Sequence, residues 1–108
     1  MANYLLIESR DPWESNDAAS WQEVAAGLVK EGNAVTFFLV QNGVLPARRS
    51  SKSAGLAALA RAGVEVLADD FSLRERGIDS GRLADGVKPA SIDVVVECLA
   101  AGHKVIWH

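Results

Sequence analysis

The chain has one cysteine, Cys98, and two histidines among its 108 residues. A single thiol excludes an internal disulfide, and one thiol with two histidines is a poor ligand set for a metal ion. His103 and His108 lie five positions apart on a predicted strand, so their side chains are expected on opposite faces. We interpret both as solvated terminal histidines and expect no metal site.

The sequence also lacks a long hydrophobic run, a secretory signal and an excess of positive charge. The apolar run at residues 35–40 is far shorter than the ~20 residues of a membrane-spanning helix. No basic residues precede the first apolar stretch, as they would in a secretory signal. The 11 basic and 14 acidic side chains give a net charge of −3, which argues against binding to nucleic-acid phosphates. We expect a cytoplasmic protein with neither membrane nor nucleic-acid partners.

Three common functional motifs are missing as well. The sequence has no Walker-type phosphate loop, no G-x-G-x-x-G after the first predicted strand and no G-x-S-x-G nucleophile elbow. These absences remove the commonest signatures of nucleotide binding and serine hydrolysis. We expect no cofactor.

Short apolar strands alternate with amphipathic helices along what the length predicts to be a single domain, residues 1–108. Strands are predicted at residues 3–9, 34–40, 64–68 and 104–107, with a weak edge strand near 86–88. Helices are predicted from Asp17 or Ser20 to Gly32, and at residues 51–62, 72–77 and 91–101. The last is opened by Pro89, and its apolar residues Ile92, Val95, Val96 and Leu99 are expected to share one face. Pro46 is expected to keep the loop after the second strand irregular. Strands separated by helices pair in parallel, which predicts a three-layer α/β/α sandwich.

In such sheets ligands bind outside the carboxyl ends of the strands. Three predicted loops, at residues 8–11, 41–44 and 69–72, lie at that edge. The candidate ligand-binding residues in these loops are Glu8, Ser9, Gln41, Asn42, Gly43, Asp69, Asp70 and Ser72.

Most of these residues also have a simpler structural explanation. Asp69 is a candidate acid or base, but Asp70 or Ser72 at the start of a short helix is readily explained as its cap. Gln41, Asn42 and Gly43 form a sequence typical of a turn. We favour the structural explanation in both loops.

A basic cluster and one of the tryptophans are expected at the surface. Arg48, Arg49 and Lys52 lie in a serine-rich stretch, which favours a solvated loop over an anion site. Trp21 fits the apolar stripe of the first helix, whereas Trp13 follows a proline in a loop. We interpret Trp13 as a candidate anchor between subunits, because aromatic residues are enriched in interfaces.

The order of elements includes a strand, a tryptophan-bearing helix, Phe-Phe-Leu-Val-Gln-Asn-Gly-Val at residues 37–44 and Gly-Val-Glu-Val-Leu-Ala at residues 63–68. An apolar helix and Lys-Val-Ile-Trp follow near the end of the chain. Over nearly its whole length this succession resembles the small DsrE/DsrF/DsrH-type proteins, which have the YchN-like fold. The resemblance implies a mostly parallel five-stranded sheet and homo- or hetero-oligomers, often trimers or hexamers. It also implies sulfur relay through a cysteine persulfide, toward sulfur oxidation or tRNA thiolation.

The sequence departs from that family pattern at the reactive cysteine. The DsrE-type pattern places this cysteine after the third strand, where this chain has Asp69 and Ser72. The DsrH-type pattern places it on the first helix, where residues 25–27 are Ala-Ala-Gly. Only a thiolate attacks sulfane sulfur and holds it, so relay by the usual route is not expected.

Cys98 is the remaining candidate for a sulfur-carrying thiol. It lies on the last predicted helix, beside the expected core positions Val95 and Leu99 and next to Glu97. A neighbouring carboxylate raises the pKa of a thiol, and free cysteines usually serve as small buried hydrophobes. We favour a structural role for Cys98.

Three functional hypotheses follow. The first, which we favour, is a non-catalytic or accessory DsrE-like oligomer that binds a small ligand or a protein partner in sulfur-related metabolism. The second is a sulfur carrier that uses Cys98. The third is a small enzyme in which Asp69 acts with Glu8 or Asp11, and it requires these carboxylates to converge on one pocket.

Overall fold

A five-stranded, all-parallel sheet forms the middle of the molecule. The computed structural model describes residues 2–13, 17–48 and 53–108, so Arg49 and Lys52 of the basic stretch lie outside the described residues. The strands are β1 (Asn3–Glu8), β2 (Ala34–Leu39), β3 (Glu65–Asp69), β4 (Val87–Ala90) and β5 (Lys104–Trp107). Their order in the sheet is β4-β3-β2-β1-β5, and every neighbouring pair is parallel. The predicted α/β class and parallel five-stranded sheet are confirmed.

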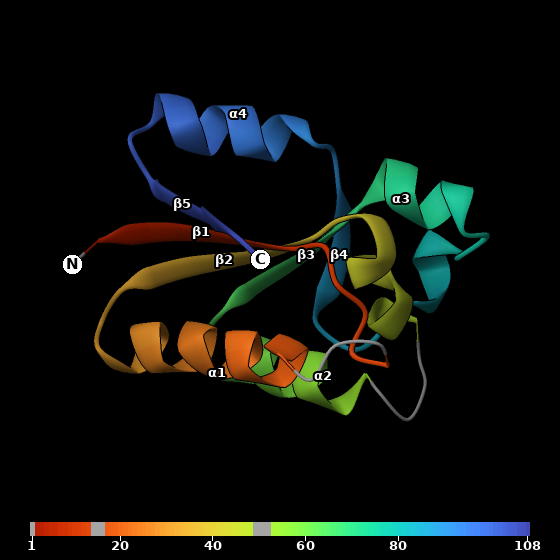
Figure 1. Ribbon diagram of the computed structural model, residues 1–108, viewed down its shortest axis with the longest axis horizontal. Helices are drawn as coiled ribbons and strands as arrows, with labels where there is room; N and C mark the ends of the chain where they lie inside the picture. The colour runs from red at the N-terminus through yellow and green to blue at the C-terminus, as the bar shows by residue number, and fades with distance from the viewer. Residues whose placement is uncertain (1, 14–16, 49–52) are drawn as a thin grey trace.

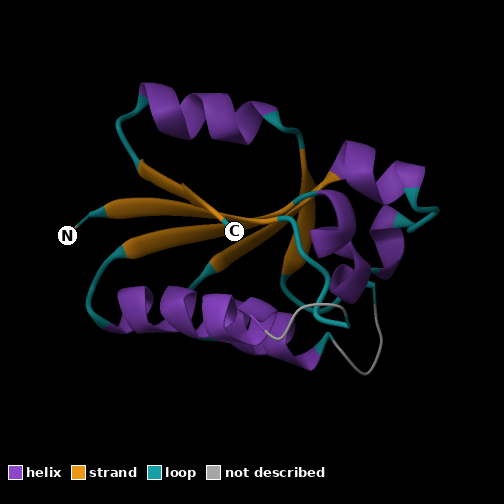
Figure 2. Cartoon of the chain, viewed as in Figure 1, coloured by secondary structure: helices purple, strands orange, loops and turns teal. Residues whose placement is uncertain are grey.

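Helices cover both faces of this sheet. Helices α1 (Asp17–Lys30) and α2 (Ala54–Arg61) lie on one face and α4 (Asp93–Ala100) on the other (Figure 1). The short α3 (Asp70–Glu75) and the 3-10 helices η1 (Gln41–Ala47) and η2 (Ser80–Arg82) gather where the central strands end. Figure 2 shows the resulting three layers. None of the helices within the described ranges is long and apolar enough to cross a bilayer.

The strand residues alternate between two hydrophobic clusters. Leu6, Phe37 and Val66 pack toward α1 and α2, together with Leu56 of α2. On the other face, Leu5, Ile7, Phe38, Val40, Leu67 and Cys98 form the second cluster, against which Val94 and Val95 of α4 pack. Because β1, β2 and β3 are buried on both faces, they read in the sequence as continuous apolar runs.

Two prolines differ from their predicted settings. Pro46 lies inside η1, where irregular structure was expected. A 3-10 turn accepts the fixed φ of proline, near −65°, in a short segment. Pro89 lies within β4, opposite Ala68 of β3, instead of opening a helix. β4 is an edge strand, and an edge strand tolerates the missing proline N–H.

Helix α4 buries a different face from the predicted one. Ile92, Val96 and Leu99 are 52%, 64% and 58% exposed, whereas Val95 and Cys98 pack toward the sheet. The segment is apolar nearly all round, so the helical period alone does not distinguish its two apolar faces. The predicted grouping of Val95 with Val96 and Leu99 is therefore wrong, and an apolar strip on α4 faces outward.

Candidate functional site

A pocket lies at the carboxyl edge of the central strands, between α3, α4 and the ends of β1, β2, β3 and β5. Its volume is about 760 Å³, within the range of roughly 300–1,000 Å³ that small-molecule sites occupy. Its apolar lining residues are Ile7, Val40, Phe71, Ile92, Val95 and Trp107. Its polar lining residues are Ser9, Gln41, Asn42, Asp69, Ser72, Glu75 and Arg76. The structure thus brings five of the eight sequence candidates together: Ser9, Gln41, Asn42, Asp69 and Ser72.

Asp69 and Ser72 form the buried polar floor of the pocket. The two residues are 5% and 4% exposed. Asp69 Oδ2 accepts hydrogen bonds from the Ser72 backbone N–H at 3.1 Å and from the Ser72 hydroxyl at 2.7 Å. Asp69 is therefore the N-cap of α3, and the expectation that Asp70 or Ser72 caps this helix is wrong. The helix begins earlier because β3 runs through Asp69 directly into it.

The same network extends to the end of β2. The Gln41 backbone N–H donates to Ser72 Oγ at 2.9 Å. Gln41 has a φ of 52°, a left-handed conformation that costs a non-glycine residue about 1–2 kcal/mol. The Ser72 hydroxyl helps to offset this cost, so Asp69, Ser72 and Gln41 form one connected unit across two strand ends.

Arg76 closes the α3 side of the pocket. Its Nε donates to Asn42 Oδ1 at 3.1 Å, and a terminal guanidinium nitrogen donates to the Ser72 carbonyl oxygen at 3.3 Å. These bonds hold the guanidinium against the protein. Glu75, the neighbouring lining residue, is an exposed carboxylate on the same helix.

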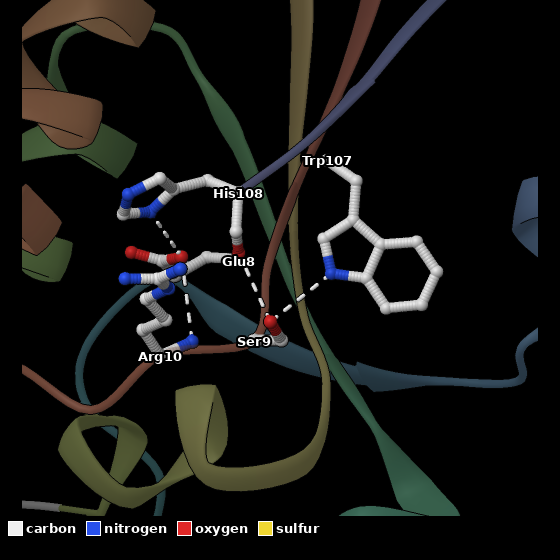
Figure 3. Close-up of polar contacts among 5 residues, drawn as sticks. All are labelled: Glu8, Ser9, Arg10, Trp107 and His108. Atoms are coloured by element: carbon white, nitrogen blue, oxygen red, sulfur yellow. Dashed lines mark hydrogen bonds and ion pairs between the residues drawn. The ribbon is translucent and has the colours of Figure 1, made fainter.

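Ser9 and Trp107 form the opposite side of the pocket. Trp107 Nε1 donates to Ser9 Oγ at 3.0 Å, and Ser9 Oγ donates to the His108 carbonyl oxygen at 3.0 Å (Figure 3). The indole is 64% exposed although its N–H is bonded. These contacts hold the ring at the pocket rim, with much of its surface open to solvent.

Glu8 faces the other side of β1, away from Ser9. Its carboxylate Oε2 lies 2.8 Å from His108 Nδ1 (Figure 3). The His108 ring packs on Trp21 of α1, with 5.4 Å between the ring centroids. His108 is therefore not the solvated residue that was expected. His103 Nδ1 is also buried, with no hydrogen-bond partner among the residues placed by the structure. No group of three or more metal-ligating side chains occurs within the described part of the chain.

The remaining candidates do not line the pocket. Gly43 of η1 packs against the backbone of Glu8, where a Cβ would overlap the carbonyl oxygen, so its role is to let η1 approach the end of β1 closely. Asp70 and Asp11 are absent from the lining, and Asp11 Oδ1 accepts from the Trp13 backbone N–H at 2.8 Å. Asp69 therefore has neither Glu8 nor Asp11 beside it in the pocket, which weighs against the paired-carboxylate hypothesis.

Cys98 is buried in the cluster between α4 and the sheet and does not line the pocket. Burial raises the pKa of its thiol above the ordinary value, and the Glu97 and Glu65 carboxylates raise the pKa further. A raised pKa lowers the thiolate fraction at neutral pH and slows attack on sulfur.

Several lining residues were not sequence candidates. Trp107 ends β5, which pairs with β1, so its position at the carboxyl edge was available from the strand pattern. Phe71 was inside a predicted site loop but lacked a polar group. The packing of α3 and α4 brings Glu75, Arg76, Ile92 and Val95 to the pocket, and no local sequence pattern indicates this packing.

The close approach of Gly43 to Glu8 predicts a large effect of one methyl group. Gly43→Ala is expected to lower the free energy of unfolding by about 1–3 kcal/mol, because the Cβ overlaps backbone atoms. Gly27→Ala is the control: α1 has open space there, so alanine should stabilise by ~0.5–1 kcal/mol. Urea unfolding monitored by circular dichroism measures both. Equal effects of the two substitutions would contradict this account of Gly43.

Comparison with known proteins places the fold. No protein-family model and no curated protein matches the chain. The crystal structure of the ychN protein from E. coli has a TM-score of 0.89 and 19% identity, with full coverage of both chains. MTH1491 from Methanobacterium thermoautotrophicum, a protein of unknown function, has a TM-score of 0.86 and 21% identity, again with full coverage. BT1422 from Bacteroides thetaiotaomicron, also of unknown function, has a TM-score of 0.78 and 14% identity over 98% of this chain and 94% of its own. The chain therefore has a YchN-like fold.

Proposed function

We propose that this protein is a non-catalytic, oligomeric accessory protein that binds a small ligand at the carboxyl edge of its sheet. The observation that carries the proposal is the pocket itself. It has a buried polar floor at Asp69 and Ser72, apolar walls and a tryptophan at its rim. Convergent polar groups within an apolar concavity are the usual form of a small-molecule site.

The side chains of the pocket support binding over covalent chemistry. No cysteine or histidine lines it among the residues that the structure places. The Ser72 hydroxyl donates a hydrogen bond to Asp69. A serine nucleophile also needs a general base whose pKa lies near neutral pH and a group of donors that stabilises the oxyanion. The Ser72 hydroxyl oxygen instead accepts a hydrogen bond from the Gln41 backbone N–H, and the residue is 4% exposed. Both observations favour a structural role for Ser72.

The link to sulfur metabolism rests on the family resemblance of the sequence. A DsrE-like chain with Asp69 and Ser72 in the region of the persulfide cysteine would accompany sulfur-carrying subunits without carrying sulfur itself. Its own pocket would then bind a ligand that those subunits do not.

Ligand binding is testable with the three tryptophan indole N–H signals in a ¹H–¹⁵N correlation spectrum. We expect some members of a library of cationic, anionic and neutral small-molecule fragments to shift the Trp107 signal. The reason is that the Trp107 indole N–H donates a hydrogen bond to Ser9, which lines the pocket. The Trp13 and Trp21 signals are internal controls, since neither residue lines the pocket. Absence of any fragment that shifts Trp107 selectively would contradict the proposal.

Oligomer formation is supported by exposed apolar side chains on α4 and β5. Val96, Leu99 and Ile106 are 64%, 58% and 43% exposed. These side chains lie on two elements that contact each other, and an exposed apolar patch is typical of an interaction site.

We expect the wild type to have a multiple of the 11.5 kDa chain mass by light scattering. Val96→Lys should shift it toward the monomer, because it places a charge in the interface. Val24→Lys on α1, 43% exposed on the other face, is the matched control and should leave the mass unchanged. A monomeric wild type would refute the oligomer.

A sulfur carrier that uses Cys98 is the alternative function. The burial of Cys98 and the raised pKa of its thiol weigh against it. We expect reduced wild type to gain no sulfur after incubation with a sulfane-sulfur donor, as measured by intact mass, while the thiol is alkylated after unfolding. Cys98→Ser is the control. A gain of one sulfur atom in the wild type alone would establish the carrier function.

A further inference from the structure

We infer that the pocket selects a cationic ligand, specifically a small molecule with an amidinium or ammonium group on an aromatic or apolar body. This inference rests on the proposed ligand-binding function and names the chemical class of its ligand.

The two carboxylate oxygens of Asp69 differ in their hydrogen bonds to the described part of the chain. Oδ2 accepts both hydrogen bonds from Ser72, whereas Oδ1 has no hydrogen-bond partner among the described residues. The side chain is 5% exposed and lines the pocket. Oδ1 is itself covered by protein, and a buried carboxylate oxygen without a donor is energetically costly. A ligand N–H reaches Oδ1 once the side chains that cover it move aside, and the ligand then gains more binding free energy than it would from an oxygen that already has a donor.

The charges around Asp69 favour a cation. Glu75, one turn beyond Ser72 on α3, adds a second carboxylate to the lining. Among the described lining residues Arg76 alone has a positive side chain, and its guanidinium already donates to Asn42 and to the Ser72 carbonyl. Because α3 begins at Asp70 with Asp69 as its cap, the amide donor of Ser72 is already used and is not available to an anion.

The rim supplies surfaces for the body of such a ligand. Trp107 and Phe71 are 64% and 57% exposed and both line the pocket. Aromatic faces attract cations and stack on planar groups. Ile92, which precedes α4, and Val95 of α4 complete an apolar wall between floor and rim. A planar cation can therefore place its N–H groups at the floor and its ring at the rim.

Benzamidine is a suitable probe, because it combines an amidinium with a benzene ring. Benzoate and benzyl alcohol have the same ring with a negative and a neutral head group. We expect benzamidine to shift the Trp107 indole signal with an affinity at least about tenfold higher than that of either control compound, as a charged hydrogen bond provides.

Asp69→Asn separates the charge of Asp69 from its capping role. Asparagine caps helices as well as aspartate, so the fold should be retained, which circular dichroism checks. When the side-chain oxygen of the new asparagine accepts the hydrogen bonds from Ser72, the side-chain NH₂ group takes the place of Oδ1. The variant then has a donor where the wild type has an acceptor. We expect benzamidine affinity to fall about 10- to 100-fold and benzoate affinity to rise. Asp70→Asn is the matched control, since Asp70 does not line the pocket, and it should change affinity by less than about twofold.

The outcomes separate this inference from the proposed function. Preference for benzamidine, lost in Asp69→Asn and kept in Asp70→Asn, supports it. Equal or tighter binding of benzoate or benzyl alcohol at Trp107, unaffected by Asp69→Asn, overturns the cationic assignment and leaves ligand binding intact. Failure of all three compounds to bind overturns the inference, while the wider fragment screen decides the proposed function separately.

Discussion

The hydrogen bonds between Asp69 and Ser72 connect the parts of the molecule on which the pocket depends. They end β3, begin α3 and, through the Gln41 N–H, hold the end of β2 in a left-handed conformation. One acidic side chain therefore fixes the floor of the pocket, and its second carboxylate oxygen is buried with no hydrogen-bond partner among the described residues. Asp69, Ser72 and Gln41 thus form one hydrogen-bonded unit at the carboxyl edge of the sheet.

The parallel sheet determines which side chains can meet at this edge. Successive residues of β1 point to opposite faces, so Ser9 enters the pocket while Glu8 pairs with His108 beside α1 (Figure 3). The same alternation keeps Glu8 away from Asp69, although both residues end central strands. The likeness to the ychN protein and MTH1491 establishes the fold, but one fold supports many functions, and the site has to be argued from its own residues.

Much of the architecture could be predicted because β1, β2 and β3 have strong apolar patterns between polar loops. The edge of the sheet that holds the pocket followed from the parallel topology. The buried face of α4 could not be predicted, because Val95 and Val96 are equally apolar and only the sheet distinguishes them. The pairing of His108 with Glu8 joins residues at opposite ends of the sequence, so no local pattern indicates it.

The most direct test of a ligand site at Asp69 is a crystal structure of the protein grown with benzamidine. The account predicts the amidinium within hydrogen-bond distance of Asp69 Oδ1 and the ring against Trp107 or Phe71. An amidine bound elsewhere, with the Asp69 carboxylate satisfied by a protein group that moves into the pocket, would contradict it.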